Sequence, residues 1–268
     1  MVFKYPISIV FTNPLKRFSK KTLQPENQDS TLIKRDQLNL FNEALIDNAV
    51  QKLGLESIVS AQELFFKFAG KIFVEDPFYD IRMSYFFDIL IYEDLSIYYP
   101  KIQTQIFPFN TLFDYLISNK PTHIDKFNFT FNHYKNFSKP IHSLFKVINA
   151  ENESMILRDF FSKKNLTISN QKNQFFKGIA KGSFLQGFMF PCEEGYIASI
   201  GIIVHPKPCN RYIKLFLNNP PSTDIDKKMI LLNRLAFAQL QQSRMKHVNP
   251  FQIYKGVLFE DKNSVYSQ

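Results

Sequence analysis

The sequence predicts an α+β protein in which a helical N-terminal half packs on a curved antiparallel sheet or small barrel, closed by a long C-terminal helix. Three patterns carry this prediction. Apolar residues recur at three- and four-residue spacing over much of residues 31–120, short Phe-, Ile- and Val-rich runs follow residue 123, and helical spacing returns after residue 223. The patterns divide the chain into a basic N-terminal arm or strand at 1–30, a mainly helical domain at 31–120, a β-rich domain with the C-terminal helix at 140–259, and a tail at 260–268.

Amphipathic spacing predicts the helices of the N-terminal half. Apolar residues three or four apart form one face from Leu38 to Leu53, and Gly54 is a typical helix stop. Ser60 and Glu63 have the spacing of a capping box, which predicts that a second helix begins there and runs over residues 61–73. Further helices are expected at residues 81–90 and 110–118, with a connection over residues 92–99.

The β-rich half is predicted from short apolar runs separated by Asn, Lys, Ser and Gly. Five glycines lie within 24 residues, from Gly178 to Gly201, where the turns, bulges and corners of a small barrel would use them. Seven runs have strand length and spacing. These runs are residues 144–148, 155–161, 166–169, 174–179, 184–190, 196–204 and 211–217.

The long C-terminal helix has clear signals at both ends. Thr223 and Asp226 have the spacing of a capping box, and helical apolar spacing continues to about Met245. We expect this helix to end before Pro250. Residues 251–259 are expected to form one more strand.

The net charge of +9 is unevenly distributed along the 268 residues. Residues 1–25 carry +5, six basic and thirteen acidic residues give residues 26–100 a charge of −7, and residues 101–268 carry +11. Such asymmetry is typical of contact with nucleic acid or an anionic surface, or of contact between the acidic and basic parts within one molecule or across a dimer.

Composition favours a folded, soluble and cytoplasmic protein. Cys192 and Cys209 are too few for a disulfide framework or a four-cysteine zinc site, and no apolar stretch approaches the roughly 18 residues of a membrane span. The alternative location is an organelle, because residues 1–25 contain no acid and resemble a presequence. Pro6, Pro14 and Pro25 argue against it, since they would interrupt the required amphipathic helix.

A basic patch on the predicted barrel is the main candidate binding site. Phenylalanine pairs at 160–161 and 175–176 are interleaved with its cations, and in a strand one member of each pair must face away from the core. Barrels with such residues can bind single-stranded nucleic acid by phosphate contact and base stacking. The alternative is a solvated lysine face above buried phenylalanines. The cations are Arg158, Lys163, Lys164, Lys172, Lys177 and Lys181.

An acidic cluster is the second candidate. Glu75, Asp76 and Asp80 surround Pro77, and paired carboxylates can serve acid–base chemistry or bind a hard metal ion, although helix capping and solvation are commoner roles. His205 and Cys209 share a stiff proline-containing loop, which does not suit a thiol nucleophile. We therefore expect no catalytic residue, no metal and no cofactor.

Two resemblances accompany these patterns. Several short segments are similar to a loose family of uncharacterised bacterial proteins with an aromatic FFxWF-like segment in a helical half and an LRDL-like segment in a β-rich half. The segments are 75–77, Arg82, 86–91, 143–147, 157–160, 181–182 and 187–188. Some members carry a cysteine-rich SEC-C zinc motif, which these 268 residues lack, so the resemblance implies neither metal nor catalytic residue. Residues 183–204 with the helix after residue 222 also resemble the end of a GAF-type sensory domain.

The function expected from the sequence is a non-catalytic interaction or regulatory (ligand-sensing) module, whose partner is a protein or a second copy of the chain. The alternative is a nucleic-acid- or polyanion-binding protein that uses the patch at residues 158–181. An enzyme ranks third, because no nucleophile, base and orienting group come together in the sequence.

Overall fold

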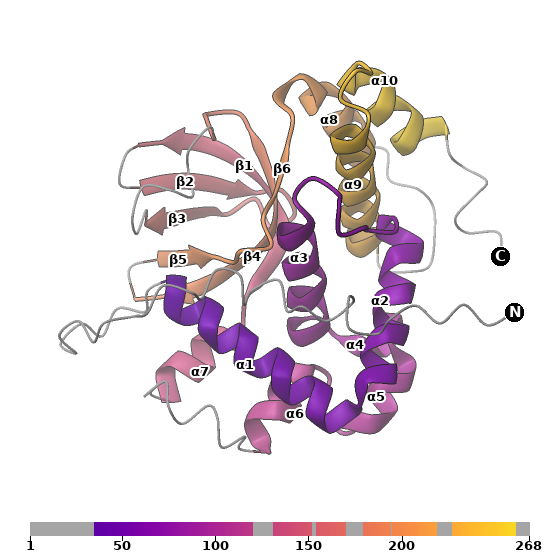
Figure 1. The fold of residues 1–268 in the computed structure, drawn as a ribbon. Coiled ribbons are helices and arrows are strands. Elements are labelled where there is room, and N and C mark those ends of the chain that lie inside the picture. The colour runs from indigo at the N-terminus through magenta and orange to yellow at the C-terminus, as the bar shows by residue number, and fades with distance from the viewer. Residues whose placement is uncertain are drawn as a thin grey trace, which may run out of the picture.

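A computed structural model describes residues 35–119, 131–151, 154–169, 179–193, 195–218 and 227–260. It confirms the α+β class: a closed five-stranded barrel lies beside a set of helices, with β2 and β3 at the margin farthest from α2 and α9 (Figure 1). No helix in these ranges has the length and apolar character that crossing a membrane requires.

The helical half contains two long helices joined at a glycine. Helix α1 (Arg35–Leu53) ends at Gly54, whose φ of 78° lies in the left-handed region, and α2 (Leu55–Ala69) begins directly after it. The predicted capping box of Ser60 and Glu63 is therefore wrong, because both residues lie inside α2. The buried residues of α2 run from Ile58 to Ala69 with helical spacing, so the helix already includes residues before Ser60.

Helix α3 (Tyr79–Tyr92) is buried on most of its surface and runs through the centre of the molecule. Two short helices follow it: α4 (Leu95–Tyr98), which lies in the segment expected to be a connection, and α5 (Pro100–Ile106), for which no element was predicted. Helix α6 (Leu112–Ser118) confirms the fourth predicted helix, with Thr111 as its N-cap accepting a hydrogen bond from the Asp114 N–H. Helix α7 (Phe131–Phe137) precedes the barrel.

Five strands form the barrel in the order β1-β2-β3-β5-β4, closed by pairing of β4 with β1. All pairs are antiparallel except β3 with β5. Strand β1 is long and shared, because its first half pairs with β4 and its second half with β2, with a bulge between Val147 and Asn149. The strands are β1 (Ile141–Ala150), β2 (Ser154–Asp159), β3 (Asn165–Ser169), β4 (Phe184–Cys192) and β5 (Gly195–Ala198).

Strand β4 is buried on both faces, which explains its nearly continuous apolar sequence. Leu185 and Met189 point into the barrel, where they join an apolar cluster with Phe145. Phe184 and Phe188 point the other way and belong to the larger core that the barrel shares with the helices. The barrel wall thus separates two cores.

The chain after β5 differs most from the expected structure. The predicted strand at 196–204 is interrupted, and only β6 (Ile203–His205) continues it, paired with β4. The predicted strand at 211–217 is wrong: a 3-10 turn, η4 (Lys207–Cys209), leads into helix α8 (Asn210–Asn218). Its buried residues Ile213, Phe216 and Leu217 are three and four apart, so the segment has helical spacing.

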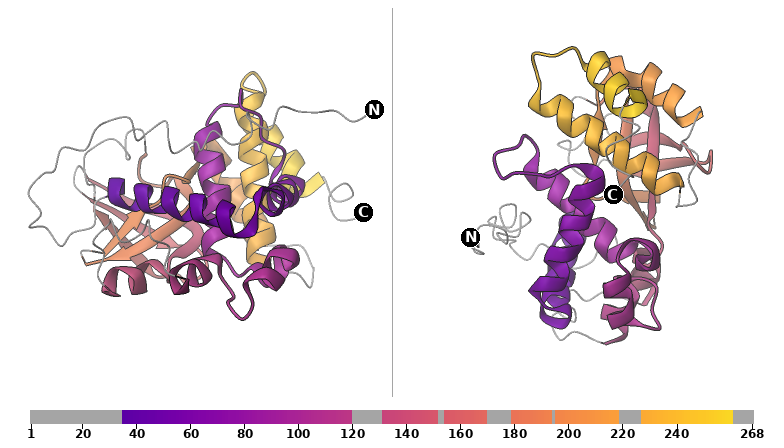
Figure 2. Two further views of the ribbon diagram at one scale, coloured as in Figure 1. Left: turned by 60° about the horizontal axis from the view of Figure 1, so that its bottom comes forward. Right: turned by 90° about the vertical axis from the view of Figure 1, so that its right-hand side faces the viewer.

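Helix α9 (Lys227–Arg244) confirms the long C-terminal helix and packs against α2 and β6 (Figure 2). Its predicted capping residues, Thr223 and Asp226, lie outside the described residues. The predicted strand at 251–259 is wrong, because α10 (Pro250–Lys255) and a π-helical turn, η5 (Gly256–Glu260), occupy it. Pro250 stands at the first position of α10, with Asn249 as N-cap.

Candidate functional site

The hairpin between β2 and β3 carries part of the predicted basic patch and is shaped by Asp159. The buried Asp159 carboxylate accepts hydrogen bonds from the Ser143 and Ser162 hydroxyls and from the backbone N–H groups of Phe161, at 3.0 Å, and Ser162, at 3.3 Å. Because these bonds turn the carboxylate inward, the hairpin presents cations rather than this acid to solvent.

The described members of the predicted patch are exposed. Arg158 extends from the outer face of β2, Lys163 and Lys164 lie in the hairpin, and Lys181 precedes β4. Lys172 and Lys177 lie outside the described residues. The Lys163 Nζ lies 3.9 Å from the centre of the Phe160 ring, which is half-buried and packs on the shared core. The predicted exposure of one Phe of the 160–161 pair is not seen, since both are half-buried.

The strand register adds one cation that the sequence analysis missed. Lys146 on β1 is directly opposite Arg158 on β2, and Asn165 on β3 continues the row. We use "basic barrel surface" for Lys146, Arg158, Lys163, Lys164 and Lys181. Lys146 lies outside the sequence segment that suggested the patch, and only the pairing of β1 with β2 reveals it.

A second cationic region adjoins the basic barrel surface. The Asn210 Nδ2 donates a 2.8 Å hydrogen bond to the carbonyl of Gly182, which places the start of α8 beside Lys181. Arg211 and Lys214 are exposed on α8, and Lys207 is exposed in the turn before it. The start of α8 therefore lies next to the segment of the barrel that carries Lys181.

Helix α10 completes this second region. It packs against α8 and η4, and the rings of Tyr212 and Phe251 are 6.0 Å apart in an edge-to-face arrangement. Phe251 is 40% exposed and Leu215 is 41% exposed. We define the "α8–α10 surface" by these exposed residues together with the half-buried Tyr212. Its members are Lys207, Arg211, Tyr212, Lys214, Leu215, Phe251 and Lys255.

The α8–α10 surface is built from acid-free sequence. Residues 203–218 and 245–259 contain no Asp or Glu, whereas they contain five Lys and Arg residues. The described barrel strands and their connections carry exposed acids only at Glu151 and Glu193. Among the described residues of these segments, exposed cations outnumber exposed acids.

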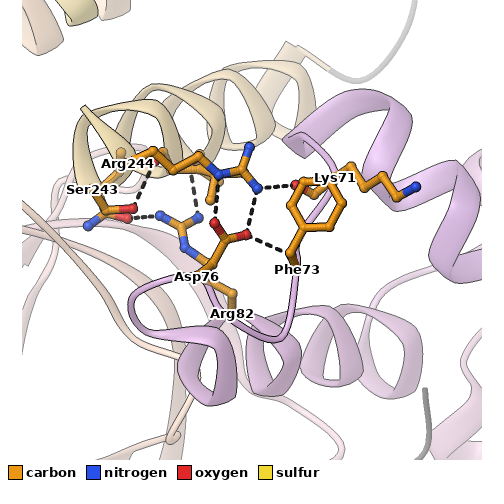
Figure 3. Close-up of polar contacts among 9 residues, drawn as sticks. Lys71, Phe73, Asp76, Arg82, Ser243 and Arg244 are labelled. Carbon is orange, nitrogen blue, oxygen red and sulfur yellow. Dashed lines mark hydrogen bonds and ion pairs between the residues drawn. The ribbon is translucent and has the colours of Figure 1, made fainter. Parts of the chain in front are cut away.

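The predicted acidic cluster does not converge on one site. Glu75 is exposed, while Asp76 forms an ion pair with Arg244 of α9, whose Nε and Nη2 donate at 2.7 and 2.5 Å (Figure 3). The Phe73 N–H also donates to Asp76, and Arg244 bonds the Lys71 carbonyl at 2.6 Å. Asp76 therefore fastens the loop between α2 and α3 to α9.

Two guanidinium groups, those of Arg244 and Arg82, act on the charge of Asp76. Burial alone raises the pKa of this carboxyl, but the hydrogen bond and charge of Arg244, with the Phe73 N–H, bring the pKa below its ordinary value. The second guanidinium, that of Arg82, is almost fully buried and donates to the Ala236 carbonyl and to Gln239. Burial lowers the pKa of Arg82 to about 10, so it stays charged at neutral pH. Asp76 therefore belongs to an ion arrangement with Arg244 and Arg82, whereas Glu75 is exposed and Asp80 lies in the first turn of α3.

A chain of buried polar side chains crosses the boundary between barrel and helices. The Gln186 Nε2 donates to the Tyr85 hydroxyl at 2.7 Å and to the Leu232 carbonyl at 2.8 Å, while Tyr85 is 2.9 Å from the His142 Nε2. His142 Nδ1 is 2.5 Å from Glu93. We use "buried polar chain" for Glu93, His142, Tyr85, Gln186, His205 and Tyr254.

Hydrogen-bond chemistry assigns the donor and the acceptor nitrogen of His205. Burial lowers the pKa of His205 to about 3, so its imidazole is neutral at pH 7. Its Nε2 lies 3.2 Å from the Gln186 Oε1, which can only accept, so Nε2 carries the proton and Nδ1 accepts from the Tyr254 hydroxyl at 2.8 Å.

The Tyr85 hydroxyl accepts from Gln186 and lies 2.9 Å from the His142 Nε2, and the His142 Nδ1–H donates to the Glu93 carboxylate. Burial raises the pKa of Glu93, but the neighbouring His142 brings it below its ordinary value.

Burial argues against a reaction at these groups. Tyr85, Gln186 and Tyr254 are fully buried, and the Glu93 side chain is 20% exposed. Cys209 is also buried, and burial raises the pKa of its thiol to about 12, which opposes thiolate formation. Among the described residues, no three His, Cys, Asp or Glu side chains gather as a metal site. The exposed Lys and Arg side chains of the basic barrel surface and the α8–α10 surface are, by contrast, accessible to a ligand.

Comparisons with protein-family models, with curated proteins and with solved structures each returned no match. The resemblances drawn from the sequence stay predictions, and function has to be argued from the residues themselves.

Proposed function

We propose that this protein is a non-catalytic binding module whose ligand is a polyanion, with nucleic acid as the best candidate. The observation that carries the proposal is the closeness of the two cationic regions in the chain fold, since the bond from Asn210 to the Gly182 carbonyl brings the start of α8 next to the segment that carries Lys181. Cations spread over a face with few acids neutralise successive phosphates, and release of counterions then drives binding.

The barrel topology supports the same ligand. Five-stranded Greek-key barrels of the oligonucleotide- and oligosaccharide-binding type bind on the face around their second and third strands. The barrel of this chain also has five strands, in the order β1-β2-β3-β5-β4. Arg158, Asn165 and Thr167 are exposed on β2 and β3, the corresponding strands. The analogy is one of topology.

The test is binding of a labelled oligonucleotide of about 16 nucleotides, followed by fluorescence anisotropy between 50 and 200 mM salt. We expect the affinity to fall with rising salt. The charge-reversed variant Arg158→Glu/Lys164→Glu/Lys181→Glu should bind at least about tenfold more weakly, and its dependence on the logarithm of salt concentration should be shallower by about 2, because three phosphate contacts are lost.

A matched control reverses three exposed lysines of the helical half, Lys52→Glu/Lys67→Glu/Lys101→Glu. It changes the net charge by the same amount and leaves both cationic surfaces intact. Equal weakening by the two triple variants would mean that overall charge, rather than the basic barrel surface, drives binding. The proposal fails if the unchanged protein binds no nucleic acid at low salt.

A further inference from the structure

We infer that the α8–α10 surface binds single-stranded nucleic acid by stacking a base on Phe251, an inference that rests on the proposed function. Single-strand binding requires cations that follow the phosphates and an aromatic ring that offers its face to a base. The α8–α10 surface combines these two elements, whereas the aromatic residues Phe160 and Phe161 beside the basic barrel surface are half-buried.

The cations lie on one exposed face of α8. Arg211 and Lys214 are three residues apart and Leu215 follows, so they share a face, while Ile213 and Phe216 on the opposite side are buried. Because residues 203–218 and 245–259 lack Asp and Glu, no acid of these segments offsets the field. Charge complementarity therefore selects an anionic partner.

The aromatic component lies next to these cations. Phe251 is 40% exposed and contacts the ring of Tyr212, the neighbour of Arg211 in sequence. On α10, Lys255 is four residues from Phe251 and also exposed, so a cation and a ring share one face. A phosphate bound by Arg211 or Lys255 would bring its base within reach of Phe251.

Helix α10 holds Phe251 in a fixed place. The Asn249 side chain accepts a 3.0 Å hydrogen bond from the Phe251 N–H, and Ile253 and Tyr254 are buried beneath the helix. The Tyr254 hydroxyl contacts His205, which joins α10 to the buried polar chain. An aromatic ring on an anchored helix loses little conformational entropy on binding, which favours its use in recognition.

An exposed ring favours single strands over duplexes. The faces of duplex bases are occupied by stacking on their neighbours, whereas unpaired bases leave a face free for an aromatic side chain. A polyanion without bases would use the cations and gain nothing from Phe251. Binding therefore has two separable contributions, which are phosphate contact with the cations and base stacking on Phe251.

The experiment compares a labelled single strand of about 16 nucleotides, its duplex and inorganic polyphosphate as a competitor. Phe251→Leu keeps an apolar side chain but removes the ring, so we expect single-strand affinity to fall at least about fivefold and duplex affinity to stay unchanged. Phe251→Tyr keeps the ring and should bind as the unchanged protein does. Circular dichroism and thermal melts establish that each variant is folded.

The matched control is Phe73→Leu, because Phe73 is 47% exposed and lies on the loop between α2 and α3. Binding should not change. Equal affinity for single strand and duplex, with no effect of Phe251→Leu, would overturn the inference and leave the proposed function standing. Absence of binding to every nucleic acid at low salt would overturn both. Tighter binding to anionic phospholipid vesicles, lost in Phe251→Leu, would assign the surface to a membrane and also overturn the inference.

Discussion

Strands β1 and β4 bury two faces of contrasting chemistry. Inside the barrel, Phe145 of β1 is opposite Leu185 of β4 in an apolar cluster, and the hydrogen-bonded pair of Ser143 and Asp159 lies on the same face of β1 and β2. On the helix-facing side, the same strands place His142 and Gln186 among aromatic rings, with the His142 and Phe188 rings stacked 4.2 Å apart.

The difference shows how each side is specified. The apolar cluster inside the barrel depends on strand register and on filling its volume, so apolar substitutions that conserve volume should cost little there. The helix-facing side also depends on directional hydrogen bonds in a medium of low polarity, where an unpaired group is costly. The buried polar chain therefore determines how the helices dock, while apolar burial supplies most of the stability of both sides.

The largest effect is expected inside the barrel. Phe145→Ala should lower the free energy of unfolding by about 3–5 kcal/mol, because it removes a fully buried ring and leaves a cavity. Urea denaturation measures this loss. Phe107→Ala is the control, since Phe107 is 79% exposed and its removal should cost less than about 0.5 kcal/mol. A similar cost for both variants would contradict the assigned interior.

The helix-facing side should respond to loss of polarity rather than volume. Gln186→Leu leaves the Tyr85 hydroxyl, the Leu232 carbonyl and the His205 ring each without one partner, so we expect a loss of about 3 kcal/mol in urea denaturation. The adjacent Leu185→Met, which faces the barrel interior, should cost less than about 1.5 kcal/mol. If Gln186→Leu is as mild as Leu185→Met, the comparison between the two sides fails.

Acid should destabilise the helix-facing side first. The pKa of His205 is about 3 in the folded chain against 6.5 ordinarily, so between these values only the unfolded chain takes up the proton. Stability is complete above pH 6.5 and falls as pH decreases toward 3, by up to about 1.4 kcal/mol per pH unit. His205→Gln should make this dependence shallower between pH 6.5 and 4.5 in denaturation experiments, and an unchanged slope would contradict the assignment.

The smallest effect is expected at the Asp76–Arg244 ion pair, which lies outside both regions. Asp76→Asn should cost about 1 kcal/mol, because Arg244 is partly exposed and water screens the pair. The cost should shrink with added salt. The folded pKa of Asp76 is lowered, so its contribution is present above the ordinary pKa and is lost as pH falls through the folded pKa.

The control for this variant is Glu75→Gln, which changes the exposed neighbouring acid. Stability should stay within about 0.5 kcal/mol of the unchanged protein. Faster hydrogen exchange of the loop at residues 70–78 in Asp76→Asn, and not in Glu75→Gln, would show that the ion pair fastens this loop.

Part of the site was predictable from sequence. The exposed members of the basic barrel surface, Arg158, Lys163, Lys164 and Lys181, follow from charge and strand pattern. Lys146 was not predicted, because strand register sets it opposite Arg158. The α8–α10 surface was missed for a local reason: both segments are short, and short apolar runs do not distinguish strand from helix.

One sequence signal could have found the missed surface. Residues 245–259 lack acids, as do residues 203–218, and the two prolines around Lys207 with Asn249-Pro250 are typical helix-start patterns. The apolar residues Ile213, Phe216 and Leu217 have three- and four-residue spacing in the sequence, which is typical of a helix. Proximity of α8 to α10 would still have required the fold.

The sequence by itself determined the α+β class, the helices α1, α3 and α9, and most barrel strands, because periodic burial is a local property of each segment. Only the tertiary structure decided which polar residues meet. Glu93, His142, Gln186 and Tyr254 come from different elements. Hydrogen bonds link them, directly or through Tyr85 and His205, because strand register and helix packing bring distant residues together.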